Sequence, residues 1–141
     1  PSPRYFVTNV HGGLIPLQPL SKPTLSNQSL INWAARAASA AFTVNYVQYR
    51  QQMENTKDTY FTTNGAQQYQ QQFVQSNDLE TVINGNYVVV AQPNAAPIII
   101  KQGVELHNNQ NIYAWYVNMP LLVTFHNPNQ TIRRFFEVKL K

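Results

Sequence analysis

The spacing of hydrophobic positions along the chain changes near residue 86. Before this point, apolar residues recur every three or four positions, which is typical of helices with one buried face. After it, apolar and polar residues alternate, which is typical of strands with one buried face. This order predicts a helical part over residues 26–85 and a sheet over residues 86–141.

The first predicted helix has the clearest pattern. Ser26 offers a side-chain oxygen to the free N–H groups of a helix start, and the pattern continues to about Phe42. The apolar stripe of this helix consists of Leu30, Ala34, Ala37, Ala38 and Ala41. So many alanines allow the helix to approach a sheet or another helix closely. Further helical patterns cover residues 46–60 and 66–75, with a short helical turn at residues 77–83.

Four strands are predicted in the second half, at residues 87–91, 98–104, 112–125 and 131–140. Turns rich in asparagine and proline separate them. Alternation in the last two strands predicts a core face made of Tyr113, Trp115, Val117, Met119, Leu121, Val123, Phe125, Ile132, Phe136, Val138 and Leu140. Pro120 interrupts this pattern, and proline inside a sheet indicates an edge or a bulge that exchanges the two faces.

Residues 1–25 are predicted to precede the helical part as a separate segment. Residues 4–10 favour a strand, residues 11–13 a turn, and Leu14 and Ile15 can pair back as a short hairpin. Prolines at positions 16, 19 and 23 favour an extended connector. We therefore predict one domain over residues 1–141, divided at 25 and 85. Its class is α+β, with two or three helices packed on one face of a curved antiparallel sheet of about four strands.

The composition excludes several kinds of site. The 141 residues include no cysteine, so a disulfide, a thiolate zinc site and a cysteine nucleophile are excluded. Only 11% of the residues are charged, and 16 Asn and 15 Gln supply much of the polarity. No apolar run reaches the roughly 18 residues that span a bilayer. Because the sequence begins with Pro1 rather than Met, we interpret it as a fragment or a processed form, with any targeting segment outside it.

The residues that most often perform chemistry are scattered. The histidines lie in or beside predicted turns and lack the spacing of metal ligands: His11, His107 and His126. Glu54 and Asp58 lie one helical turn apart, which is typical of a solvated surface, and Glu105 lies at a strand end. No P-loop, GxSxG or GxGxxG motif is present. We therefore predict no catalytic, cofactor-binding or metal-binding residue, no cofactor and no enzymatic activity.

Two other functions are kept as alternatives. The net charge is +4, and aromatic and cationic residues mix between Tyr113 and Lys139, as they do in modules that bind single-stranded nucleic acid. Against this, the cations are scattered, and Arg133-Arg134 is their only adjacent pair. A cone-shaped α+β fold can also enclose a small molecule or an active site, which requires a buried carboxylate or histidine in the pocket.

The face of the sheet opposite the core is the candidate interface. Counting alternate residues, it carries Tyr116, Leu122, Arg133, Phe135 and Lys139. Aromatic residues beside arginine match the composition of interface centres. Two alternatives are that Pro120 shifts the alternation and buries Leu122, and that Tyr116 and Phe135 cover a flank of the domain's own core.

Short motifs run through the chain in a fixed order. They are Arg4-Tyr5-Phe6, Gly13-Leu14-Ile15-Pro16-Leu17, Trp33-Ala34, Asn45-Tyr46-Val47, Tyr60-Phe61-Thr62, Leu79-Glu80, Ala96-Pro97 and Tyr113-x-Trp115-x-Val117-x-Met119-Pro120-Leu121-Leu122. In order and spacing this series resembles the DotI/IcmL family of type IVB secretion systems, which includes the TraM protein of related conjugative plasmids. The glutamine-rich segment and the polar turn at residues 108–111 depart from the family pattern, so secretion and conjugation both stay open.

The resemblance implies a fold like that of the periplasmic domain of the eighth VirB protein, in the nuclear-transport-factor-two-like class. It implies a bitopic protein of the bacterial inner membrane, with a transmembrane helix before Pro1 and this chain in the periplasm. It also implies a non-enzymatic role in assembling a secretion or conjugation channel through protein–protein contacts. The implied partners are other inner-membrane core proteins, among them a DotJ-like protein, with a homo-oligomer as a further option. Nucleic acid is not an implied partner.

Overall fold

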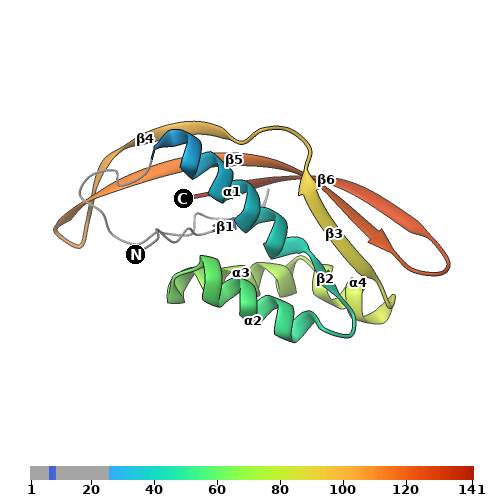
Figure 1. Cartoon of the computed structure of the whole chain (residues 1–141). Coiled ribbons are helices and arrows are strands. Elements are labelled where there is room, and N and C mark those ends of the chain that lie inside the picture. Colours follow the sequence, from blue (N-terminus) through green and yellow to red (C-terminus); the bar gives the residue numbers. More distant parts are fainter. Residues whose placement is uncertain (1–6, 9–25) are drawn as a thin grey trace.

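A computed structural model describes residues 7–8 and 26–141, in which helices lie on the concave side of a curved sheet (Figure 1). The helices are α1 (Asn27–Phe42), α2 (Tyr49–Tyr60), α3 (Thr63–Gln75) and α4 (Asp78–Asn84). The strands are β1 (Val7–Thr8), β2 (Val44–Asn45), β3 (Val88–Pro93), β4 (Ile98–His107), β5 (Gln110–His126) and β6 (Thr131–Leu140). The α+β class is confirmed. Of the predicted N-terminal hairpin only Val7–Thr8 is described, as β1, which pairs with β6; the rest of the hairpin and the proline connector lie outside the described residues.

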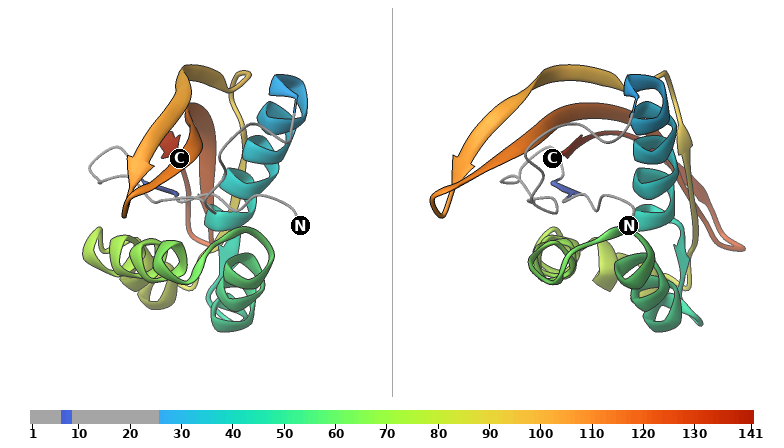
Figure 2. Two further views of the ribbon diagram at one scale, coloured as in Figure 1. Left: turned by 90° about the vertical axis from the view of Figure 1, so that its left-hand side faces the viewer. Right: turned by 60° about the vertical axis from the view of Figure 1, so that its left-hand side comes forward.

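Strand β5 is the centre of the sheet. Its pairing with β6 runs from Val117 to His126 along one edge. The other edge is divided between β3, which ends opposite Leu121, and β4, which begins opposite Asn118. The strand order is β1-β6-β5-β3-β2, with β4 also paired to β5, and every pair is antiparallel. The hairpin of β4 and β5 extends from the rest of the sheet as a curved arm (Figure 2).

Helix α1 follows the predicted stripe closely. The Ser26 hydroxyl accepts a hydrogen bond from the Ser29 N–H at 3.1 Å, so it caps the helix as the sequence indicates. The predicted stripe residues have no exposed surface: Leu30, Ala34, Ala37, Ala38 and Ala41. This face packs on β3 and β5, where the small side chains permit close contact. None of the described helices is long and apolar enough to cross a membrane.

Helix α2 begins at Tyr49, three residues later than predicted. The cause is Asn45, whose side-chain oxygen accepts hydrogen bonds from the N–H groups of Val47 at 3.0 Å and Gln48 at 2.7 Å. Such bonds form a local turn that competes with the helix. Strand β2, which contains Asn45, was also missed, because two residues give no alternation to detect. Residues 26–141 contain four helices rather than the predicted two or three, because the short turn predicted at residues 77–83 is the seven-residue helix α4.

Aromatic rings join the helices to the sheet. The ring of Phe42 lies 5.8 Å from that of Phe73 in α3 and 5.4 Å from that of Phe136 in β6, centroid to centroid. The Tyr69 hydroxyl donates a hydrogen bond to the Ala41 carbonyl at 2.5 Å, which links α3 to α1. Burial raises the pKa of Tyr69, so its hydroxyl keeps the proton that it donates. The concave side is therefore one continuous core.

The predicted core face of β5 and β6 is confirmed. Every second residue of β5 from Trp115 to Phe125 is buried, as are Val138 and Leu140 of β6. Tyr113, Ile132 and Phe136 are partly buried and pack against the same core. The alternation is unbroken from Trp115 to Phe125, whereas nearer the start of β5 Ile112 and Ala114, on the opposite face, are also buried.

Of the two alternatives predicted for Pro120, an edge or a bulge, the bulge is absent. Pro120 lies opposite Glu137 of β6, and the register is continuous on both sides of it. The Pro120 carbonyl accepts a hydrogen bond from the Asn94 N–H at 3.0 Å, so the nitrogen of Pro120 also faces the junction between β3 and β4. No strand needs an N–H there, and the pairing with β6 is left intact. The irregularity occurs in β4 instead, between Ile99 and Lys101.

Candidate interaction surface

The sheet face opposite the helices brings together part of the predicted interface. Leu122 of β5 lies opposite Phe135 of β6, and Thr124 lies opposite Arg133. Residues directly opposite each other in an antiparallel pair share one face, so Leu122, Phe135 and Arg133 are neighbours. Phe135 is 71% exposed, while Leu122 is partly buried. The alternative in which Pro120 buries Leu122 in the core is therefore wrong.

Strand β3 adds two residues to this surface that sequence reasoning missed. Val90 lies opposite Thr124, and Val88 lies opposite His126, so both share the face of Arg133. They are 49% and 44% exposed. The alternation of β3 could have predicted their exposure, because the alternate residues Tyr87, Val89 and Ala91 are buried. We call the set the outer patch: Val88, Val90, Leu122, Arg133 and Phe135.

Lys139 and Tyr116 lie on the same face but away from the outer patch. Lys139 lies opposite Asn118 and is exposed. It is four residues from Phe135, which is about 13 Å along a strand. Tyr116 lies farther along β5, opposite Lys101 of β4. The five predicted residues therefore do not form one compact site.

Tyr116 belongs to a separate charged cluster on the arm. Its hydroxyl donates a hydrogen bond to a carboxylate oxygen of Glu105 at 2.5 Å. The ammonium groups of Lys101 and Lys141 lie 4.9 and 5.1 Å from the centre of its ring, and they lie 3.7 and 3.3 Å from the Glu105 carboxylate. Burial and the hydrogen bond to Glu105 raise the pKa of Tyr116. Glu105 therefore forms ion pairs on the outer face.

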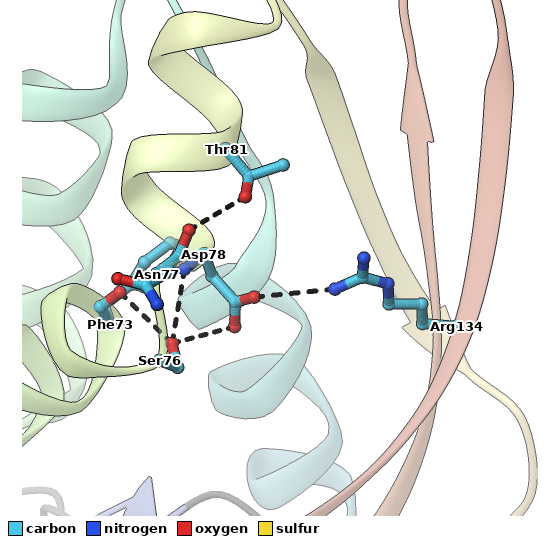
Figure 3. Close-up of polar contacts among 6 residues, drawn as sticks. All are labelled: Phe73, Ser76, Asn77, Asp78, Thr81 and Arg134. Atoms are coloured by element: carbon cyan, nitrogen blue, oxygen red, sulfur yellow. Dashed lines mark hydrogen bonds and ion pairs between the residues drawn. The ribbon is translucent and has the colours of Figure 1, made fainter.

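The adjacent arginines point to opposite faces of β6. Arg133 lies on the outer patch, whereas Arg134 lies opposite Val123 on the concave face. There the Arg134 guanidinium lies 3.9 Å from the Asp78 carboxylate of α4 (Figure 3). It also lies 5.3 Å from the centre of the Phe125 ring. Ser76 donates a hydrogen bond to the second oxygen of Asp78 at 3.0 Å, which orients the carboxylate. Arg134 thus connects α4 to the sheet.

This division gives a matched pair of substitutions. We expect Arg134→Ala to lower the free energy of unfolding by about 1 kcal/mol or less, because the pair with Asp78 is half-exposed. Arg133→Ala should leave the unfolding free energy unchanged within about 0.5 kcal/mol. Urea denaturation of both variants measures the difference. Equal losses would show that the two arginines do not differ in structural role.

The remaining polar clusters provide no enclosed site. The Glu54 carboxylate is exposed and forms an ion pair with Lys57 at 2.9 Å, beside an open depression of about 690 Å³ between α2 and α3. A ring nitrogen of His126 lies 2.8 Å from the Thr131 hydroxyl on the surface. His11 and the side chain of His107 lie outside the described part. Within residues 7–8 and 26–141, no group of three or more histidine, aspartate or glutamate side chains is arranged to hold a metal ion.

Comparison with known families decides what this domain is. The profile of the DotI/IcmL family, described as "Type-IV b secretion system, inner-membrane complex component", matches residues 1–141. The chain belongs to the DotI/IcmL family. A solved structure of the periplasmic domain of DotI is 34% identical to it, with a TM-score of 0.71 over 81% of this chain and 78% of that one. The predicted resemblance is therefore confirmed.

Two further structures agree with this assignment. An IcmL-like type IV secretion system protein from Legionella pneumophila is 26% identical to this DotI/IcmL member, with a TM-score of 0.66 over 83% of this chain and 78% of that one. A periplasmic fragment of TraM has a TM-score of 0.67 over 82% of this chain and 83% of that one. At 20% identity, the TraM fragment supports the fold alone. No curated protein sequence matches the chain.

Proposed function

We propose that this DotI/IcmL-family domain is a non-enzymatic assembly component of a type IVB secretion or conjugation channel. It acts in the periplasm, through contacts between the outer patch and other inner-membrane core proteins of the system. A DotJ-like protein is one such partner, and nucleic acid is not. The domain is held at the inner membrane by a transmembrane helix outside the given residues. The likeness to the periplasmic domain of DotI supports the compartment.

The observation that carries this proposal is the exposed apolar surface at the centre of the outer face. Phe135 exposes 71% of its surface although the concave face of the same strand is packed against helices. Val90 and Val88 add exposed apolar surface on β3, where they lie opposite Thr124 and His126 of β5. Exposed apolar surface of this kind, with an arginine beside it, is typical of an interface centre. One buried aromatic anchor there contributes about 2 kcal/mol or more to association.

The charges around the outer patch favour a protein partner. Along β6, the next cation on the face of Arg133 is Lys139, six residues farther on. Six residues of strand span about 20 Å, so the two cations do not form the continuous basic groove that follows a nucleic-acid backbone. An isolated arginine beside aliphatic and aromatic side chains instead fits a partner with an apolar centre and a carboxylate at its rim.

A charge placed at Phe135 tests the proposal. We expect Phe135→Glu in the full-length protein to reduce co-purification of the other type IVB core proteins about tenfold or more, because a carboxylate would be desolvated at the interface centre. The matched control is Val74→Glu, at a 51% exposed position of α3 on the helical side. Detergent-solubilised complexes quantified by mass spectrometry give the result.

Thermal melts of the two variants establish that both remain folded. Normal recovery of core proteins with Phe135→Glu, together with loss of recovery with Val74→Glu, would move the interface to the helices. Normal recovery with both variants would show that the outer patch is not the surface that contacts the other core proteins.

A further inference from the structure

The arm leaves one long strand edge unpaired. Strand β4 pairs with β5 along one edge, and among the described strands none pairs with the other. An edge strand exposes a row of backbone N–H and C=O groups that can pair with another chain. Proteins commonly protect such edges with short strands, prolines, β-bulges or several charges. The bulge of β4 lies near its start, between Ile99 and Lys101, and the register from Lys101 to His107 is regular. Strand β4 has ten residues and no proline, and its only charged side chains apart from His107 are Lys101 and Glu105.

The side chains along this edge are largely apolar and exposed. Ile98 and Ile100 are each 61% exposed, Val104 is 58% exposed and Leu106 is 69% exposed. Single exposed apolar residues are ordinary on protein surfaces. Four of them are concentrated in one ten-residue edge strand. A second strand paired along this edge would shield part of them from water.

The charges on β4 identify that partner strand as a second copy of β4. Lys101 and Glu105 lie opposite Tyr116 and Ile112 of β5, so both occupy the outer face. A two-fold axis perpendicular to the sheet through Gly103 places Lys101 of each copy directly opposite Glu105 of the other. The same register places Ile100 opposite Leu106, and Gln102 opposite Val104. Opposite charges and apolar side chains facing each other across strands both stabilise the pairing.

No neighbouring register is as complementary. Centring the axis on Gln102 places Ile99 opposite Glu105, and centring it on Val104 places Lys101 opposite His107. Only the register centred on Gly103 forms two Lys–Glu pairs at once. The space beside Gly103 is open to a second strand, since a Cβ atom built there meets nothing within 4 Å in the chain.

The contacts within one copy are compatible with this exchange. Lys101 is 67% exposed, and its ammonium lies 3.7 Å from the carboxylate of Glu105 in the same strand. These residues are four positions apart, about 13 Å along the backbone. The facing Glu105 of a second copy lies about 5 Å away between Cα atoms, so Lys101 reaches it with less extension. We propose that two copies of the protein associate through antiparallel pairing of their β4 edges, centred on Gly103.

Charge reversal tests the register. The Lys101→Glu variant alone places four carboxylates across the axis, and Glu105→Lys alone places four ammonium groups there. We expect each variant of the full-length protein to self-associate about tenfold or more weakly than the unmodified protein in sedimentation experiments. An equal mixture of the two variants pairs glutamate with lysine at both positions and should restore association. Failure of the mixture to associate more strongly than either variant alone would overturn the proposal.

The absence of cysteine allows a second test that does not depend on Glu105. Gln102→Cys and Val104→Cys are predicted to lie opposite each other, within the Cα separation of about 4.4–6.8 Å that a disulfide requires. A mixture of the two single variants should form several times more cross-linked dimer under mild oxidation than either variant alone. Equal yields in all three samples would contradict the register. Phe135→Glu should not alter either result, which separates this interface from the outer patch.

Discussion

Replacing Trp115 with alanine should lower the free energy of unfolding by about 3–5 kcal/mol. Trp115 has no exposed surface and is the largest fully buried side chain of the described core. Its ring packs against that of Tyr113, with 4.9 Å between the centroids. Alanine would remove this packing and leave a cavity that the surrounding sheet and helix cannot close completely. Urea denaturation followed by circular dichroism measures the loss.

The matched control is Trp115→Phe. In the described part of the chain the indole N–H of Trp115 has no hydrogen-bond partner, so phenylalanine removes volume without leaving a second polar group unpaired. We expect a loss smaller than that of alanine, about 1–2 kcal/mol. A loss below about 1 kcal/mol for Trp115→Ala would show that β5 does not form the centre of the core.

Enlarging Ala38 should destabilise the domain by about 1–3 kcal/mol, the usual range for overpacking a tight interior. Ala38 has no exposed surface and lies in the α1 face that packs on β3 and β5. Leucine adds three carbon atoms where the helix and the sheet are already in contact. Thermal unfolding of Ala38→Leu measures the effect.

Arg36→Leu provides the control on the same helix. Arg36 is exposed, and leucine and arginine have similar helix propensities, so its melting temperature should change little. A stable Ala38→Leu protein would show that α1 lies farther from the sheet than its alanine stripe indicates.

Much of the fold could be predicted because its longest elements carry strong local patterns. The helical spacing of apolar residues in α1 and the alternation in β5 and β6 predicted the core face correctly. Strand β6 spans the predicted residues 131–140. The incorrect predictions concerned features that depend on individual contacts, which the local pattern of apolar residues does not show. Asn45 delays the start of α2 through its own side chain, and Pro120 is tolerated because β3 and β4 meet beside it.

The candidate interface was only partly predictable for the same reason. Alternation placed Leu122, Arg133 and Phe135 on one face, and the pairing of β5 with β6 brought them together. The cluster of Glu105, Tyr116 and Lys141 could not be predicted, because these residues are well separated in the sequence. The different structural roles of Arg133 and Arg134 could not be predicted without the position of α4. The partner of Arg134, Asp78, is more than fifty residues away in the sequence.

Site-specific photo-cross-linking at position 135 tests the central claim most directly. A photoreactive phenylalanine analogue replaces Phe135 in the full-length protein, in cells that express the whole secretion or conjugation system, and position 74 receives the same analogue as a control. We expect position 135 to cross-link to another inner-membrane core protein of the system, identified by mass spectrometry, and position 74 not to do so. Cross-links to those proteins from position 74 alone would contradict the assignment of the outer patch as the assembly surface.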